Sequence, residues 1–229
     1  MQNLIKEIRS KKIYFFTLFS LLLLSFLFVY FYGKKESFIL LNTYHSFWLN
    51  VFFINYTFIG DGIFAVGLIG FSYFYFKNKN LAIKIFYSFL FSGTGAQVIK
   101  NLFNSPRPRL YFEAGTYLNF IDGVSLTGYS SFPSGHTAIA FAIATVLVLT
   151  SKNNNWQLII LFAALLVGYS RIYLAQHFLI DVTIGALLGC VSGLLSFLLA
   201  QMKFNFVDTF KNKLYFKSSY GQPPVLQHQ

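Results

Sequence analysis

Three ionisable side chains lie close together in a stretch of the chain that is otherwise apolar. The segment from Ser170 to Asp181 reads SRIYLAQHFLID and contains Arg171 and His177 between two long hydrophobic runs. Ionisable groups are costly in such a context and indicate a site rather than a surface. His177 and Asp181 are four residues apart, a spacing that puts them on one face of a helix. There the carboxylate could hold one ring nitrogen.

Arg171 needs a break in the helix to join this pair. It lies six residues before His177, about 240° away around an unbroken helix with 3.6 residues per turn. A continuous helix would therefore point the guanidinium elsewhere. We predict a helix end or turn between Leu174 and His177 that brings Arg171 back towards the face of His177.

Two further polar segments could complete a site for an anion such as phosphate. One is the long polar connection over residues 100–132, and the other is Pro133–His136, where Ser134 is a good N-cap for the apolar run that follows. Arginine supplies a planar fork suited to phosphate oxygens, and the N–H groups at a helix start add donors. Gly135 would let a phosphate approach the backbone closely. The groups that could form this site are Lys100, Arg107, Arg171 and the helix start at residues 134–136.

Two histidines and one carboxylate would complete a displacement reaction at phosphorus. His177 can attack, because imidazole is a competent nucleophile at neutral pH, while Asp181 would fix its tautomer and stabilise the charge that forms. His136 can protonate the leaving oxygen and later activate water. The scheme requires no metal and no cofactor. A metal site made by the same three side chains is the rival interpretation, and the neighbouring lysine and arginines oppose it.

The composition predicts an integral membrane protein. Of the 229 residues, 55% are hydrophobic and 11% are charged, far more apolar surface than a soluble domain of this size can bury. The net charge of +11 does not indicate nucleic-acid binding, because Lys and Arg flank the apolar runs as the positive-inside rule expects. The single cysteine, Cys190, excludes an intramolecular disulfide. The oligomeric state is left open.

Six apolar runs are expected to cross the membrane, and the segment Ser37–Tyr56 is expected to lie amphipathically in the interface. We therefore predict an all-α, six-helix membrane bundle with one transmembrane domain over residues 1–200. Its motif-bearing core would span 81–199, and a basic tail over 201–229 would be poorly ordered. The six runs are Ile13–Tyr32, Ile59–Phe76, Leu81–Ile99, Pro133–Thr150, Leu158–Leu174 and Phe178–Leu199.

The charge distribution predicts the orientation of this bundle. Six crossings put both termini on one side, together with the lysines at positions 77, 79 and 152. Positively charged ends of this kind mark the cytoplasmic side. The long loop, the Pro133–His136 turn and the Arg171–His177 turn then share the opposite face. We therefore expect the active site at the extracytoplasmic face.

The same residues resemble the type 2 phosphatidic acid phosphatase family, also called lipid phosphate phosphatases. Its motifs K-x6-R-P, P-S-G-H and S-R-x5-H-x3-D are matched in order by Lys100–Pro108, Pro133–His136 and Ser170–Asp181. The resemblance runs from about Leu81 to Leu199. It implies a metal-independent six-helix enzyme in which His177 forms a phosphohistidine, Asp181 orients it and His136 is the general acid. The phosphate-binding set that it implies is Lys100, Arg107, Ser134, Gly135 and Arg171, and Arg109 remains an ordinary loop residue.

We expect an integral membrane phosphatase that removes a terminal phosphate from a lipid phosphate or diphosphate. In a bacterial inner membrane the candidates are undecaprenyl diphosphate, phosphatidylglycerol phosphate, lipid A phosphates and phosphatidic acid, with selectivity expected from a lid over residues 111–129. Soluble vanadium haloperoxidases share the motifs, but the apolar runs argue against them. A transporter for a phosphorylated solute is an alternative, weakened because the sequence shows no internal inverted repeat. A non-catalytic lipid-binding relative is another, and the intact His136, His177 and Asp181 count against it.

Overall fold

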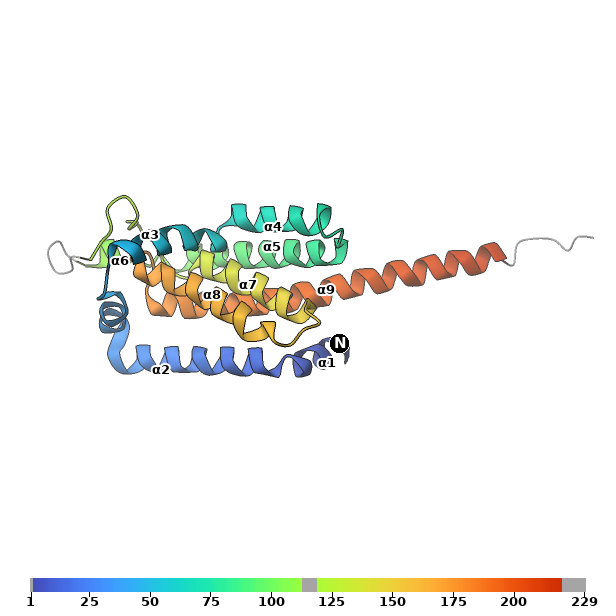
Figure 1. The fold of residues 1–229 in the computed structure, drawn as a ribbon, viewed down its shortest axis with the longest axis horizontal. Helices are drawn as coiled ribbons and strands as arrows, with labels where there is room; N and C mark the ends of the chain where they lie inside the picture. The colour runs from blue at the N-terminus through green and yellow to red at the C-terminus, as the bar shows by residue number, and fades with distance from the viewer. Residues whose placement is uncertain (1, 113–118, 220–229) are drawn as a thin grey trace, which may run out of the picture.

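The computed structural model describes residues 2–112 and 119–219, and the elements in those ranges are all helical. The long helices run side by side along one axis, and the last one extends well beyond the others (Figure 1). This confirms the predicted all-α class. The elements are α1 (Gln2–Ser10), α2 (Lys12–Asn42), α3 (Phe47–Tyr56), the 3-10 helix η1 (Thr57–Gly60), α4 (Gly62–Phe74), α5 (Lys79–Leu102), α6 (Pro108–Tyr111), α7 (Gly135–Thr150), α8 (Trp156–Tyr173) and α9 (Leu179–Ser219).

Fewer than six helices are long and apolar enough to cross a membrane on their own. In the described ranges α2, α5, α8 and the part of α9 up to Met202 meet that condition. The segments Phe47–Gly60 and Gly62–Phe74 meet it only as a pair bent by 58°, which is either a broken span or a re-entrant loop. The predicted crossing over Pro133–Thr150 is the 16-residue helix α7, shorter than the roughly 20 residues a span requires. Most of α7 is buried among its neighbours, so its length is not set by the bilayer alone. The protein is a multi-pass membrane protein, and the six full spans are not confirmed.

The segment expected to lie in the interface is divided in the structure. Gly33 has φ of 76° and interrupts α2, after which the chain turns across the end of the bundle and α3 runs back along it (Figure 1). Residues 43–46 are not helical, and Ser46 caps α3 by accepting from the N–H of Leu49. An apolar helix that begins at Phe47 thus precedes the crossing predicted to begin at Ile59. A glycine in the left-handed region and a serine cap mark the two boundaries that hydropathy did not show.

The outer surface of the bundle is apolar. Large hydrophobic side chains such as Phe16, Leu24, Phe74 and Phe162 are exposed on α2, α4 and α8. Soluble proteins rarely expose contiguous apolar surface of this kind. The surface is that of a protein whose helices contact lipid.

Three glycines at intervals of four residues let α9 lie directly against α7. A methyl group on Gly185 would lie 2.6 Å from the carbonyl oxygen of Ser134, and one on Gly193 would lie 2.7 Å from Cβ of Thr145. The backbone at Gly189 is equally close to Ala138. Small residues at this spacing allow close helix approach in membranes. The contact places the start of α7 beside the start of α9.

Replacing Gly189 with alanine should therefore destabilise the protein. The added methyl group would meet the backbone of α7, and overpacking of this kind costs roughly 1–3 kcal/mol. Gly93→Ala on α5 is the matched control, because a methyl group there meets nothing within 4 Å. We expect a lower apparent melting temperature in detergent for Gly189→Ala only. An equal loss in both variants would contradict the close α7–α9 contact.

The helix α9 continues to Ser219, into the segment from residue 201 for which a poorly ordered tail stays a prediction. The reason is visible in the sequence, which has no glycine or proline between residue 201 and Gly221 to end the helix. Residues 220–229 of the predicted tail lie outside the described residues.

Candidate active site

Three chain segments that carry the sequence motifs meet at one end of the bundle. The C-terminal end of α5, the N-terminal end of α7 and the α8–α9 connection all lie near α6 (Figure 1). Backbone hydrogen bonds join them, because Ser134 N–H donates to the carbonyl of Asp181 over 2.9 Å and Ser131 N–H donates to the carbonyl of Ser105 over 3.1 Å. The structure thus brings the three motifs together.

The predicted turn between Arg171 and His177 is present. Helix α8 ends at Tyr173, Ala175 has φ of 50°, and α9 begins at Leu179. The carbonyl of Arg171 accepts the N–H groups of Gln176, over 3.0 Å, and of His177, over 3.1 Å. These bonds fold the chain back so that His177 returns beside Arg171.

His177 and Asp181 come together in a different way from the one we predicted. His177 precedes α9, so the pair does not share the face of one helix. Asp181 lies in the first turn, and its Oδ2 accepts the N–H of Phe178 over 2.9 Å. This is the acidic half of a capping box, in which a side chain in the first turn returns to the residue that starts the helix. The helix start, rather than helical periodicity, places the carboxylate beside the imidazole.

The carboxylate and the imidazole are close but not hydrogen-bonded. His177 Nδ1 lies 3.7 Å from Asp181 Oδ2, and the two side chains are 2% and 0% exposed. Oδ2 also accepts the hydroxyl of Ser131 over 2.5 Å. Neither Nδ1 nor Asp181 Oδ1 has a hydrogen-bond partner among the described residues. Catalytic hydrogen bonds are often long without substrate, so a distance of 3.7 Å is compatible with the predicted pairing of the two side chains.

Burial lowers the pKa of His177 to about 4, and the charges of Arg171 and Arg107 act in the same direction while Asp181 opposes them. Removing an imidazole from water disfavours its charged form. The ring is therefore neutral at neutral pH, which leaves a nitrogen lone pair available. A neutral, buried imidazole is the state that a nucleophilic histidine requires.

Two buried guanidinium groups near this histidine form no direct ion pair with a carboxylate of the described residues. Arg171 and Arg107 are 4% and 8% exposed, and neither forms an ion pair with a carboxylate of the described residues. Arg171 Nη1 donates to Thr57 Oγ1 over 2.5 Å, while its Nε has no partner among those residues. Arg107 donates to the carbonyl of Gln176 over 3.3 Å and to Ser130 Oγ over 3.4 Å. Buried cations are normally paired, so this arrangement is suited to an anion.

The start of α7 completes the cationic surface. Ser134 is its N-cap, as predicted, and its Oγ accepts from the N–H of Thr137 over 3.4 Å and the hydroxyl of Thr137 over 2.8 Å. The hydroxyl of Ser134 accepts in both contacts, so its own proton is not used by them. A methyl group on Gly135 would lie 3.8 Å from Lys100 Nζ, which places the ammonium beside the first-turn N–H groups. Such groups have no intrahelical partners and bind anions.

His136 faces a residue that the sequence analysis did not include in the site. Its Nε2 lies 3.6 Å from Oδ2 of Asp61, between η1 and α4. Other omitted residues hold predicted ones: Thr57 contacts Arg171, and Ser131 contacts Asp181. None belongs to a recognisable motif, and the one signal for Asp61 is a single acid between apolar stretches.

Of the two arginines in the long loop, Arg107 belongs to the site and Arg109 does not. Arg109 pairs with the exposed Asp122 over 3.4 Å, which agrees with its predicted role as a loop residue. By contrast, Lys34 reaches the site end of the bundle, donating to Ser105 Oγ over 3.3 Å and lying 4.2 Å above the ring of Phe178. Part of the predicted lid, residues 113–118, lies outside the described residues.

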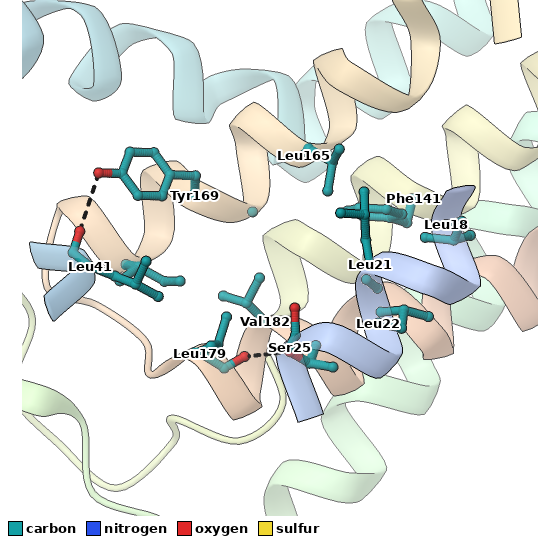
Figure 2. Close-up of a pocket in the computed structure, with 14 residues that line it drawn as sticks. Leu18, Leu21, Leu22, Ser25, Leu41, Phe141, Leu165, Tyr169, Leu179 and Val182 are labelled. Atoms are coloured by element: carbon teal, nitrogen blue, oxygen red, sulfur yellow. Dashed lines mark hydrogen bonds between the residues drawn. The ribbon is translucent and has the colours of Figure 1, made fainter. Parts of the chain in front are cut away.

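A polar and an apolar cavity lie near this end of the bundle. The polar one, of about 630 Å³, opens beside Lys100 and is otherwise lined by Gln97, Asn101, Asn104, Tyr129 and Ser130. Figure 2 shows an apolar pocket of about 170 Å³ between α2, α7, α8 and α9, lined by leucines of α2 and by Leu179 and Val182 of α9. The predicted catalytic residues are not among its described lining, so it is separate from the polar site.

Two curated proteins are similar in sequence to part of this chain. One is 43% identical over 68 residues, covering 30% of this chain and 32% of the relative, and is named bacitracin transport permease protein BcrC from Bacillus licheniformis. Another is 33% identical over 132 residues, which cover 56% of this chain and 57% of the relative, and is named undecaprenyl-diphosphatase from Sulfolobus acidocaldarius. The chain thus spans about a third to just over half of the length of these curated relatives.

A solved structure extends the similarity to the fold. The crystal structure of Aquifex aeolicus LpxE superposes with a TM-score of 0.62 at 34% identity and covers 71% of this chain and 93% of that one. The sequence model of the PAP2 superfamily matches residues 81–205, the region that carries the three motifs. These findings agree with the resemblance inferred from the motifs, and the chain belongs to the PAP2 superfamily.

Proposed function

We propose that this protein is a membrane phosphatase that removes the terminal phosphate from a lipid phosphate or diphosphate through a phosphohistidine at His177. The observation that carries this proposal is the pair of buried guanidinium groups, Arg107 and Arg171, which form no direct ion pair with a carboxylate of the described residues and lie near a neutral imidazole. A transferable phosphate would supply the missing negative charge and an electrophile in the same space.

In the first step His177 Nε2 attacks phosphorus, because Nδ1 is the nitrogen that faces Asp181. A P–N bond forms as the bond to the leaving oxygen breaks, and His136 gives that oxygen a proton. In the second step His136 takes a proton from water, whose oxygen attacks phosphorus and releases His177. Asp181 stabilises the charged imidazole in between.

The remaining predicted residues would hold the phosphoryl group. Arg171 and Arg107 stabilise charge on the oxygens as the group is transferred, and Lys100 adds a third cation beside the helix start. The N–H groups at Gly135 and His136 and the hydroxyl of Ser134 add donors. This assigns each motif residue a distinct contact with the same group.

The substrate class that we favour is a polyprenyl diphosphate, with undecaprenyl diphosphate as the first candidate. A relative that aligns over 56% of this chain is named undecaprenyl-diphosphatase. The polar cavity beside Lys100 has room and hydrogen-bonding groups for the second phosphate of such a substrate. Phosphatidylglycerol phosphate, lipid A phosphate and phosphatidic acid are the competing substrates.

Phosphate release by the detergent-purified protein tests this function. The panel contains the four lipid classes named above, with EDTA present throughout. We expect release without added metal and the highest rate with the diphosphate. Release that disappears with EDTA would contradict the metal-free scheme, and a preference for phosphatidic acid would contradict the diphosphate assignment.

Transport is the second candidate, because one relative is named a transport permease. A carrier needs a sealed membrane to move its solute, whereas an enzyme turns over in detergent. Uptake into sealed vesicles without phosphate release in detergent would favour transport.

The orientation of the site is also a proposal, in which both termini are cytoplasmic and the site faces outwards. The native Cys190 is buried, so single cysteines can be introduced at exposed positions. We expect Leu126→Cys, in the site-end loop, to react with a membrane-impermeant maleimide in intact cells. Lys152→Cys, in the α7–α8 turn, should react only after permeabilisation. The reverse pattern would invert the topology and the pool of lipid that the site can reach.

A further inference from the structure

We infer that Asp61 is a positioning residue for His136, and that the break between α3 and α4 forms a fourth part of the active site. This inference rests on the proposed phosphatase function, because it assigns a partner to the general acid of that reaction. Asp61 lies outside the residues 81–205 that match the superfamily, and none of the three motifs includes it.

The carboxylate of Asp61 is held in a defined orientation. Its Oδ1 accepts the N–H of Ile63 over 2.8 Å and caps α4. Its Oδ2 is directed to the other side, 3.6 Å from Nε2 of His136. Because one oxygen is fixed at the helix start, the second is presented to the imidazole. Both side chains are about one-third exposed, so the pair borders accessible space.

The backbone next to Asp61 packs directly on His136. A methyl group on Gly60 would lie 2.8 Å from the carbonyl oxygen of His136 and 2.7 Å from Cγ1 of Val167. No side chain fits between these two segments without a shift. The distance between Asp61 and the imidazole is therefore set by the contact of η1 with α7 and α8.

The same break reaches the phosphate-binding residues. Thr57, at the start of η1, accepts from Arg171 Nη1 over 2.5 Å. Asp61, four residues later, also interacts with the charge of Arg171. One short segment thus contacts both the expected general acid and one of the arginines.

The contact between Asp61 and His136 would help His136 to act as a general acid. Burial disfavours a charged His136, and the charges of Arg171, Lys100 and Arg107 act in the same direction. Asp61 supplies the opposite charge. With the carboxylate 3.6 Å from Nε2, the other ring nitrogen is left to give its proton to the leaving oxygen, as in the aspartate–histidine part of a catalytic triad. The proton moves from nitrogen to oxygen, and Asp61 itself gains none.

The simpler interpretation is that Asp61 only caps α4. Asp61→Asn separates the two roles, since asparagine caps a helix about as well as aspartate but carries no charge. Asp122→Asn is the matched control, because it makes the same change in a carboxylate that is 97% exposed at the same end of the bundle. If Asp61→Asn folds poorly, Asp61→Ser also preserves a cap and removes the charge.

The test compares two substrates that differ in their need for a proton on the leaving group. The leaving group of an alkyl phosphate is a poor one, an alkoxide, and its departure depends on the general acid. The leaving group of p-nitrophenyl phosphate is p-nitrophenolate, which departs without protonation. General acid catalysis contributes about 10²–10⁴-fold. We expect Asp61→Asn to lower kcat about 10–100-fold on the alkyl phosphate, no more than the lower limit of that range because His136 itself remains, with a much smaller loss on the aryl phosphate and little change in KM. His136→Asn should show the same selectivity.

Equal losses on both substrates, or no loss on either, would overturn the role of Asp61. So would a similar effect of Asp122→Asn. Failure of the proposed function is distinguishable, because the parent protein would then release phosphate from neither substrate, or His177→Ala would remain active on both.

Discussion

Replacing His177 with alanine is expected to lower phosphate release by at least about 10⁴-fold, the scale seen when a nucleophile is removed. The imidazole is buried beside Arg171, and burial with the nearby arginines keeps it uncharged at neutral pH. Alanine leaves the cations that bind phosphate but removes the atom that would form the P–N bond. Substrate affinity should therefore fall much less than turnover. The measurement is phosphate release in detergent with EDTA, beside a melting curve for each variant.

A covalent intermediate gives this prediction a second readout. Brief incubation with a substrate labelled in its terminal phosphate should leave acid-labile label on the parent protein and none on His177→Ala. His177→Gln, which fills more of the same buried space, controls for the cavity that alanine creates. Residual turnover above a few per cent in either folded variant would remove His177 as the nucleophile.

The motif residues could be predicted from the sequence because their type and spacing carry the chemistry. The turn after Arg171 followed from the six-residue separation, and Ser134 was recognisable as an N-cap, and the structure has both. The contact of His177 with Asp181 was predicted for a different reason from the one observed. Four-residue spacing suggested a helix face, while the structure uses a capping bond from Phe178 to Asp181. The spacing was informative although the local structure assigned to it was wrong.

The residues that support the motifs could not be predicted in this way. Thr57 and Arg171, which are in contact, are 114 residues apart in the sequence, and Ser131 and Asp181 are 50 residues apart. A single hydroxyl or carboxylate in an apolar segment has many structural uses, so its partner becomes visible only when the helices are packed. The glycines that join α9 to α7 set that packing.

Hydropathy located the helices better than it located their ends. Hydropathy does not detect Gly33, whose backbone conformation interrupts α2. It also does not detect Asp61, which caps α4 at the 58° bend that separates this helix from α3 and η1. It also treats a buried helix and a lipid-facing helix alike, so α7 was expected to be a full crossing although it is short and mostly enclosed. Hydropathy is averaged over many residues, so it does not show helix boundaries that are set by capping or by tertiary packing.

Arg171→Lys is expected to lower kcat/KM about 10–100-fold, corresponding to a loss of roughly 1.4–2.7 kcal/mol of transition-state stabilisation. Nη1 of Arg171 is engaged by Thr57, whereas Nε has no partner among the described residues. The guanidinium can therefore keep the threonine contact and present another donor to phosphate. A lysine ammonium is a single point on a flexible stem and cannot hold both positions with the same geometry.

Arg109→Lys is the matched control for this change. Arg109 carries the same guanidinium at the same end of the bundle, but it is more exposed and pairs with Asp122. Steady-state kinetics and inhibition by inorganic phosphate should be measured for both variants. We expect weaker phosphate inhibition and slower turnover for Arg171→Lys and near-parent values for Arg109→Lys. If Arg171→Lys matched the parent in both measurements, charge alone would suffice at this position. The planar fork held by Thr57 would then have no part in binding the transferred group.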